Sequence, residues 1–238
     1  MSRPTKQSPG QSLASAARRK IGTILRRLFK VYGRVDPPPE GPVLDELVAT
    51  ILSQNTSDAN STAALASLVR QFADWDAVRT APVKRIARAI RCGGLAEQKA
   101  PRIKAILQQI HDRHGSLSLE MLREMPACKA LEYLRGFKGV GPKTAACVLL
   151  FACRQPVLPV DTHVHRVSRR LGLIAPEADA ARAHDLLALL VPAARVLEFH
   201  IQLIRHGRTT CAARRPGCEH CVLVDLCPEG MMRLSRGA

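Results

Sequence analysis

The sequence predicts an all-α fold, and three observations support this. Apolar residues recur at three- and four-residue intervals along most of the chain, the spacing that lines one face of a helix. No stretch shows the sustained two-residue alternation of Val, Ile and Thr that is typical of a half-buried strand. Connections between the apolar stretches are about two to eight residues long, which suits antiparallel helices. With 238 residues, the chain can form one large domain or two small ones.

The N-terminal region is basic, with nine Lys or Arg and no acid in residues 1–35. Residues 1–15 are polar, and we expect them to form a disordered basic tail. Helical spacing starts at Ala16, so an amphipathic helix is expected from there to Gly33. The tail lacks the apolar centre of a secretory signal. Its chemistry also suits organelle targeting, but we expect a cytoplasmic, nucleoid-associated protein.

Beyond Pro42 the apolar pattern predicts a succession of short helices. The longest apolar run, Ala145 to Cys153, has nine residues, whereas a membrane span needs about 20. We therefore read it as a buried helix and expect no membrane association. The expected helices cover residues 44–52, 63–69, 83–91, 98–114, 118–125, 127–135, 142–153, 162–171, 178–190 and 195–206.

The charge balance predicts a polyanionic partner. The formal net charge is +16 and the isoelectric point is near 10.2. Such an excess favours nucleic acid over a membrane surface as the partner. Aromatic residues make up only 3% of the chain, which disfavours a surface that stacks the bases of a single strand.

A glycine-rich turn joins two expected helices in the middle of the chain. Its residues are Lys138, Gly139, Val140 and Gly141, and Pro142 opens the second helix. Glycine tolerates positive φ and leaves backbone amides uncovered, and amides at a helix N-terminus bind anions. In so basic a chain the expected anion is a DNA phosphate, contacted without reading sequence. The alternative is an ordinary tight turn between helices.

Two further residues are candidates for chemistry. Lys143 sits in the first turn of the second helix, where the helix dipole disfavours a cation and so favours the neutral, nucleophilic amine. A solvated lysine at a helix start is the alternative. Asp161 precedes the expected helix at 162–171 and can act as its N-cap. Its functional interpretation is a carboxylate that works with Lys143.

Four cysteines close together near the C-terminus predict a metal centre. Cys211, Cys218, Cys221 and Cys227 form a C-x6-C-x2-C-x5-C run. The two-residue step occurs in zinc and iron–sulfur sites alike. Structural zinc usually has two such close pairs, whereas here only one pair is close, which favours an iron–sulfur cluster over zinc. A disulfide is disfavoured, because the other cysteines lie singly in the chain and no secretory leader precedes them.

Taken together, these segments resemble the endonuclease III family, which are helix-hairpin-helix DNA glycosylases with a 4Fe-4S cluster. The resemblance rests on GVGPKTA at 139–145, VDTHVHRV at 160–167 and HGRTTC at 206–211, followed by the cysteine loop. It extends from about Val43 to Cys227.

This resemblance implies a two-lobed fold. A six-helix barrel would span 37–155, with the helix-hairpin-helix at about 128–153. A cluster lobe would combine 16–36 with 156–238 and carry the 4Fe-4S loop at 211–227.

The resemblance also implies an activity in base-excision repair. Lys143 would be the Schiff-base nucleophile and Asp161 its carboxylate partner. The enzyme, acting as a monomer, would remove oxidised pyrimidines from double-stranded DNA. It would also cut 3′ to abasic sites by β-elimination.

Three residues correspond to groups that distort the duplex in the family. Leu95, which follows two glycines, matches an intercalating leucine. Either Gln54 or Asn55 would fill the gap left by the flipped base, and the sequence does not decide between them. An apolar residue at Leu95 could equally anchor its loop to the core.

The chain departs from the family pattern at two points. Phe137 and Lys138 replace a common Leu-Pro before the hairpin, which should loosen the turn and add a cation. Ala96 stands where an aromatic or polar residue often follows the wedge.

Three alternative functions remain at this stage. An adenine-mismatch glycosylase usually lacks the lysine that Lys143 supplies. A non-catalytic DNA-binding paralogue is disfavoured by the intact pair of Lys143 and Asp161. The third alternative is a regulator with a zinc loop.

Overall fold

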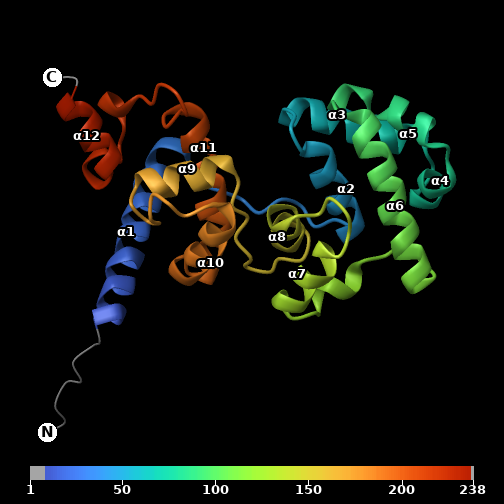
Figure 1. Ribbon diagram of the computed structural model, residues 1–238, viewed down its shortest axis with the longest axis horizontal. Helices are drawn as coiled ribbons and strands as arrows, with labels where there is room; N and C mark the ends of the chain where they lie inside the picture. The colour runs from blue at the N-terminus through green and yellow to red at the C-terminus, as the bar shows by residue number, and fades with distance from the viewer. Residues whose placement is uncertain (1–8, 237–238) are drawn as a thin grey trace, which may run out of the picture. The chain divides into compact units, whose positions relative to one another are not determined.

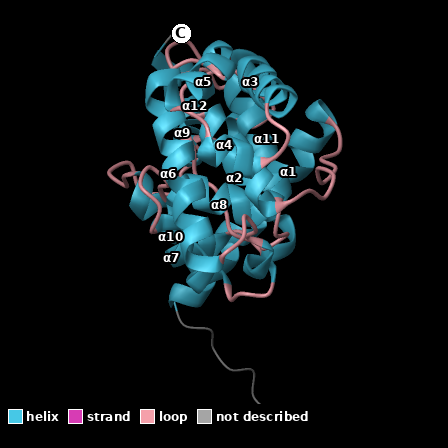
Figure 2. Cartoon of the chain, turned by 90° about the vertical axis from the view of Figure 1, so that its right-hand side faces the viewer, coloured by secondary structure: helices cyan, strands magenta, loops and turns pink. Residues whose placement is uncertain are grey.

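The structure is a computed structural model that describes residues 9–236, with side chains described from residue 15 onward. Every regular element in this range is an α-helix or a short 3-10 helix, which confirms the all-α prediction (Figures 1 and 2). The α-helices are α1 Pro9–Tyr32, α2 Val43–Ser53, α3 Asp58–Gln71, α4 Trp75–Thr80, α5 Val83–Ala89, α6 Ala96–His114, α7 Ala127–Arg135, α8 Pro142–Phe151, α9 Thr162–Arg170, α10 Ala180–Leu190, α11 Val196–Thr209 and α12 Pro228–Arg236.

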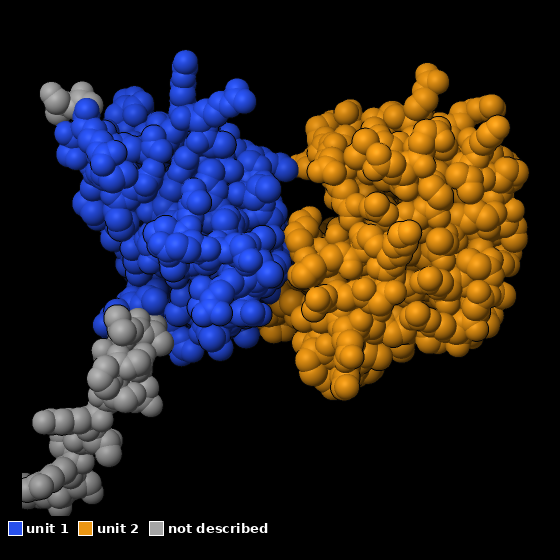
Figure 3. Space-filling view, viewed as in Figure 1, with its two compact units in different colours: residues 1–37, 158–238 blue, residues 38–157 orange. Residues whose placement is uncertain are grey.

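The chain divides into two compact units, coloured separately in Figure 3. One unit consists of Met1–Pro37 together with Leu158–Ala238, and the other is Pro38–Val157. The barrel expected from the sequence starts at 37 rather than 38 and ends at 155 rather than 157.

In the unit Pro38–Val157, α2 is the central helix. It packs against α3, α6 and α8, while α6 also contacts α4 and α5. The apolar face of α2 is fully buried because Leu47, Ile51 and Leu52 are each 0% exposed. Helix starts are fixed locally: the side chains of Ser57 and Asp74 accept hydrogen bonds from the first turns of α3 and α4.

The prediction of one helix in this unit is wrong. Residues 118–125 form a 3-10 turn, Glu120–Arg123, rather than a helix. The side chain of Glu120 accepts a hydrogen bond from the Val43 amide and pairs with Arg123. Arg123 also donates to the carbonyl oxygens of Ala152 and Gly41. These tertiary contacts fix a compact turn that the local apolar spacing does not reveal.

The other unit is built around α11, which packs against α9 and α1. Its core includes Leu25 and Leu28 of α1, Val164 of α9, and Phe199 and Leu203 of α11, each 0% exposed.

Both ends of this unit depart from expectation. Helix α1 begins at Pro9, whereas the sequence suggested a start at Ala16. The remainder of the expected tail, residues 1–8, lies outside the described residues. Helix α12 was not expected, since its apolar residues follow the cysteine loop without a long periodic stretch.

No single helix among the described residues is long and apolar enough to cross a membrane. One bent pair, Ala180–Leu190 with Ala193–Thr209, passes the test of length and composition when taken together.

Candidate functional site

The glycine-rich turn between α7 and α8 has the geometry of an anion site. Gly139 has φ +85°, a conformation that side-chain-bearing residues rarely adopt. Gly141 is extended and precedes Pro142, the first residue of α8. The amides of Gly139 and Gly141 donate no hydrogen bond within the described part of the chain. Two amides beside the N-terminus of a helix are therefore available to an anion.

Val140 lies at the centre of the turn and faces the core. Its side chain is 5% exposed and belongs to the core of the unit. Its amide donates to the carbonyl oxygen of Phe137 at 3.0 Å and closes the turn. Val140 therefore holds the turn to the core with its side chain and uses its amide within the turn.

Phe137 also behaves differently from the expectation that it loosens the turn. It is 1% exposed, and its ring packs edge-on against Tyr133 at 5.4 Å between centroids. The guanidinium of Arg113 lies over both rings. Phe137 thus anchors the turn in the core and leaves Lys138 exposed beside it.

The surface at this turn is hollowed and basic. An open depression of about 460 Å³ is lined by the turn residues together with Arg135 and Gln109. Arg135 and Lys138 are both exposed there, so two cations accompany the free amides. The depression combines dipole and charge, which is the chemistry of a phosphate contact.

Lys143 occupies the second position of α8 and is half-buried. It makes no hydrogen bond or ion pair in the described part of the chain. Glu46 of α2, which the sequence analysis missed, lies within its electrostatic range. Burial raises the pKa of Glu46, while its hydrogen bond to Thr50 and the charge of Lys143 act against that rise. The signal in the sequence was weak, because Glu46 looks like an ordinary acid in the first turn of a helix.

Asp161 caps α9, as the local reading of the sequence suggests. One carboxylate oxygen accepts a hydrogen bond from the Val164 amide at 2.7 Å. The second oxygen accepts no hydrogen bond within the described residues, so the cap leaves it available. Lys143 belongs to the unit Pro38–Val157 and Asp161 to the other unit, so their partnership stays a prediction.

The structure separates the roles of Gln54 and Asn55. The Gln54 amide is held at both ends: its Oε1 accepts from Arg102 at 2.7 Å and its Nε2 donates to Thr144 Oγ1 at 3.1 Å. Asn55 is exposed, has φ 54°, and its side chain forms no hydrogen bond in the described part of the chain. Of the two amides, that of Asn55 is the one free to meet a ligand.

Leu95 projects from a tight turn at the N-terminus of α6. It has left-handed backbone geometry with φ 53°, and its side chain is 43% exposed. Gly93 anchors the turn from beneath: a Cβ at this position would lie 2.8 Å from the Cβ of Ala64. The leucine is therefore presented to solvent on a rigid base, which does not support a role as a core anchor.

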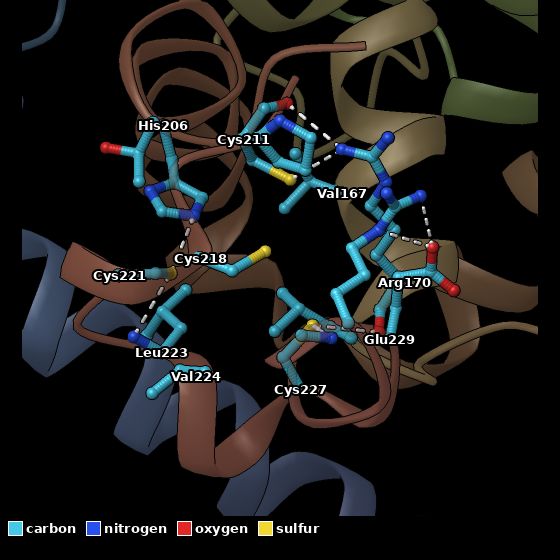
Figure 4. A pocket seen from close by; sticks show the side chains of 15 residues that line it. Val167, Arg170, His206, Cys211, Cys218, Cys221, Leu223, Val224, Cys227 and Glu229 are labelled. Carbon is cyan, nitrogen blue, oxygen red and sulfur yellow. Dashed lines mark hydrogen bonds and ion pairs between the residues drawn. The ribbon is translucent and has the colours of Figure 1, made fainter. Parts of the chain in front are cut away.

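The four C-terminal cysteines line one cavity in the unit that contains α9 and α11. Figure 4 shows the side chains of Cys211, Cys218, Cys221 and Cys227 surrounding the same space. Across the described residues, no three His, Cys, Asp or Glu side chains are grouped for a single metal ion. The donor set is thus four thiols around a shared volume.

Nitrogen groups of the protein lie against several of these sulfurs, and the amides of Leu223 and Gly230 donate to Sγ of Cys221 and Cys227 at 3.4 and 3.3 Å. Burial raises the pKa of Cys218, Cys221 and Cys227, which favours the thiol over the thiolate at each of them. Arg170 of α9 donates to Sγ of Cys211 at 3.2 Å. His206 of α11 lies 3.6 Å from Sγ of Cys221, and burial lowers its pKa to about 4.

Comparison with known proteins places the chain in a family. The model of the HhH-GPD superfamily of base excision DNA repair proteins matches residues 48–192. Endonuclease III of Sulfolobus acidocaldarius is 34% identical over 189 residues, covering 78% of this chain and 81% of that protein. This chain belongs to the endonuclease III family.

Other members of the wider family differ in length. A DNA glycosylase relative from Arabidopsis thaliana is 43% identical over 169 residues, which cover 71% of this chain but only 58% of that protein. The endonuclease III of Treponema pallidum is 32% identical over 205 residues, which cover 84% of this chain and 92% of that protein. Some relatives thus extend well beyond the shared region.

Solved structures agree with the endonuclease III fold. A non-covalent endonuclease III–DNA complex matches with a TM-score of 0.79 at 26% identity, covering 92% of this chain and 98% of that one. A trapped endonuclease III–DNA covalent intermediate matches with a TM-score of 0.78 at 27% identity, covering 91% and 98%. The helix-hairpin-helix and its following lysine lie within the matched family region.

Proposed function

We propose that this endonuclease III family member is a bifunctional DNA glycosylase and abasic-site lyase that acts on oxidised pyrimidines in duplex DNA. The observation that carries the proposal is the α7–α8 hairpin, where free amides and Lys138 flank an open depression. Half-buried Lys143 follows within one helical turn. The same short segment therefore supplies a phosphate contact and an amine.

In the proposed reaction the neutral amine of Lys143 attacks C1′ of the flipped nucleotide. The bond between C1′ and the base breaks, and the base leaves with the bonding electrons and a proton. The nitrogen lone pair then breaks the C1′–O4′ bond, O4′ takes up a proton, and the opened sugar carries an imine at C1′. The imine acidifies the C2′ proton, and loss of that proton expels the 3′ phosphate by β-elimination. An amine nucleophile thus couples base removal to strand cleavage, which water does not.

Asp161 is proposed to assist through its uncapped oxygen. A carboxylate near the reacting sugar stabilises positive charge on the ring and accepts a proton from the attacking amine. Its other oxygen remains on the Val164 amide, which fixes the orientation of the side chain. A single residue can thus both begin α9 and contribute to the chemistry.

The flipped nucleotide leaves a gap in the duplex, which Leu95 and Asn55 are proposed to fill. Leu95 is exposed on a rigid turn, which suits an apolar wedge between base steps. Asn55 presents a free amide that can pair with the orphaned base. The amide of Gln54 is instead engaged by its hydrogen bonds to Arg102 and Thr144.

Cys211, Cys218, Cys221 and Cys227 are proposed to hold a 4Fe-4S cluster. Four thiolates around one cavity match the ligand number of a cubane. Zinc would require the four sulfurs to lie about 2.3 Å from a single point. The cluster would organise the loop between α11 and α12, and it takes no part in the steps at Lys143.

Excision assays test this function against its runner-up, an adenine-mismatch glycosylase. The protein is incubated with duplexes that carry an oxidised pyrimidine, an abasic site or a mismatched adenine. Cleavage of the first two, with little release of adenine, is the expected result. Adenine release without strand cleavage would support the runner-up, and binding without any reaction would support a non-catalytic DNA-binding protein.

A further inference from the structure

Helix α6 carries two cations whose placement a phosphate-binding role does not explain. Lys99 and Arg102 are three residues apart and therefore share one face of the helix. Lys99 is only 2% exposed, and Arg102 is half-buried. A cation that serves DNA affinity through phosphate contacts is expected at the surface. Burying these two charges is unfavourable unless they have partners, so their partners indicate what they do.

Lys99 ties two separate segments together. Its ammonium donates to the carbonyl oxygen of Leu52 at 2.7 Å and to that of Gly93 at 3.0 Å. Leu52 lies at the end of α2, two residues before Gln54. Gly93 lies two residues before Leu95. One buried charge thus joins the base of the loop that presents Asn55 to the base of the turn that presents Leu95.

Arg102 ties the first of these segments to the hairpin. Its Nη1 donates to Gln54 Oε1 at 2.7 Å, and its guanidinium lies so close to Gly139 that a Cβ there would collide with Nε. The link continues through Gln54, whose Nε2 donates to Thr144 Oγ1 at 3.1 Å and to the Gly139 carbonyl at 3.4 Å. A side chain at position 139 would displace Arg102, and the positive φ of Gly139 independently favours glycine there.

We infer that Lys99 and Arg102 are positioning residues that hold three DNA-facing segments in one fixed arrangement. The segments are the gap loop (residues 53–57), the wedge turn (92–95) and the hairpin turn (138–141). All three lie in the unit Pro38–Val157, as does α6 itself, whose long course is visible in Figure 1. The inference rests on the proposed function, because it assigns these segments to DNA.

The physical reason for such a device is preorganisation. Filling a gap in a duplex requires the wedge, the pairing amide and the phosphate contact to arrive together. Segments that move independently would lose conformational entropy on binding, whereas a clamped set loses little. Lys99 donates to two backbone carbonyl oxygens at the ends of a helix and a turn, which would otherwise need solvent as partner. Arg102 adds the link through Gln54 to the hairpin, so two cations on one helix connect three chain segments.

Arg102→Met in the full-length protein tests the inference, with Arg79→Met as the matched control. Arg79 makes the same kind of bond in the same unit, from Nη1 to Gln108 Oε1 at 2.9 Å, but touches none of the three segments. Insertion of the wedge and the pairing amide into the duplex is measured with 2-aminopurine placed opposite a tetrahydrofuran abasic analogue. The fluorescence of 2-aminopurine changes when this orphaned base is unstacked. Two further measurements are made on each variant. One is the dependence of DNA affinity on salt, and the other is the rate of single-turnover excision of an oxidised pyrimidine.

For Arg102→Met we expect the fluorescence change to fall by half or more and single-turnover excision to slow about ten-fold. The slope of log affinity against log salt should stay that of the parent, because no phosphate contact is lost. Gln54→Met should reproduce these effects, and the double variant should be little worse than either single one. Arg79→Met should leave both readouts unchanged.

Two results would overturn the inference. A salt slope reduced by about one unit in Arg102→Met would make Arg102 a phosphate contact. If Arg102→Met gave the same fluorescence change and excision rate as Arg79→Met, the hydrogen bond from Arg102 to Gln54 would have no positioning role. Failure of the proposed function is distinguishable, because the parent itself would then neither excise nor cleave. Lys99→Met, paired with Lys104→Met, extends the test; Lys104 donates to the Ala81 carbonyl, away from all three segments.

Discussion

At the scale of single residues, several local interpretations are complementary rather than exclusive. Asp161 is a helix cap in the structure, yet the cap uses only one of its two oxygens. The neighbouring amides Gln54 and Asn55 are indistinguishable in sequence, and only tertiary hydrogen bonds separate them. Glu46 acquires its relation to Lys143 through the packing of α2 on α8. Residue identity therefore predicts candidates, while packing assigns their roles.

Replacing Asp161 with Asn separates its two roles. The amide keeps a side-chain oxygen that can accept the hydrogen bond from Val164, so we expect thermal unfolding close to that of the parent. The charge is lost, so single-turnover base excision should fall by about 10²-fold or more. Excision by Asp161→Asn at the parental rate would mean that Asp161 acts only as the N-cap of α9.

At the scale of elements, the sequence predicts most helices but not the turns between them. Helix α7 has the expected bounds, since Pro126 precedes it and Gly136 follows a strongly amphipathic run. The 3-10 turn at Glu120–Arg123 was missed because its hydrogen bonds reach distant segments such as Val43. The glycines predict the hairpin turn, whereas the hydrogen bond of the Val140 amide within the turn depends on how the turn packs and has no sequence signal.

The hairpin makes a prediction about salt dependence. Lys138→Ala should reduce the slope of log affinity against log salt for undamaged duplex by up to about one unit, because one phosphate contact is lost. Lys129→Ala is a suitable control, since Lys129 is exposed on α7 but does not line the depression. Equal slopes for the two variants would mean that Lys138 does not contact a DNA phosphate.

At the scale of the whole molecule, the chain combines two compact units that the sequence marks in different ways. The hairpin unit is continuous along the chain, and its helices follow from apolar spacing, but its expected bounds came from the family resemblance. The other unit brings α1 together with the C-terminal third, a pairing that came from the family resemblance rather than from any local pattern. The four cysteines could be grouped by spacing alone, but their neighbours Arg170 and His206 come from α9 and α11 and were not recognised as such.

The cysteine cavity makes a prediction about composition. Freshly purified protein should be yellow-brown, absorb broadly near 400 nm and contain about four irons per chain. Cys218→Ala should give largely insoluble protein, because the binding energy of the cluster contributes to folding. Cys128→Ala, at an exposed cysteine outside the cavity, should keep iron and solubility. Stoichiometric zinc without iron in protein purified without oxygen would contradict the cluster assignment.

The central claim is that the amine of Lys143 forms a covalent bond with the sugar at the damaged site. Borohydride reduction during reaction with an abasic-site duplex measures this directly, because it converts the imine to a stable crosslink between protein and DNA. The parent and Lys138→Ala should both be trapped, and peptide mapping should locate the crosslink at Lys143. Lys143→Ala should bind the duplex yet give neither crosslink nor strand cleavage. Parental trapping by Lys143→Ala, or a crosslink mapped to another residue, would contradict the account.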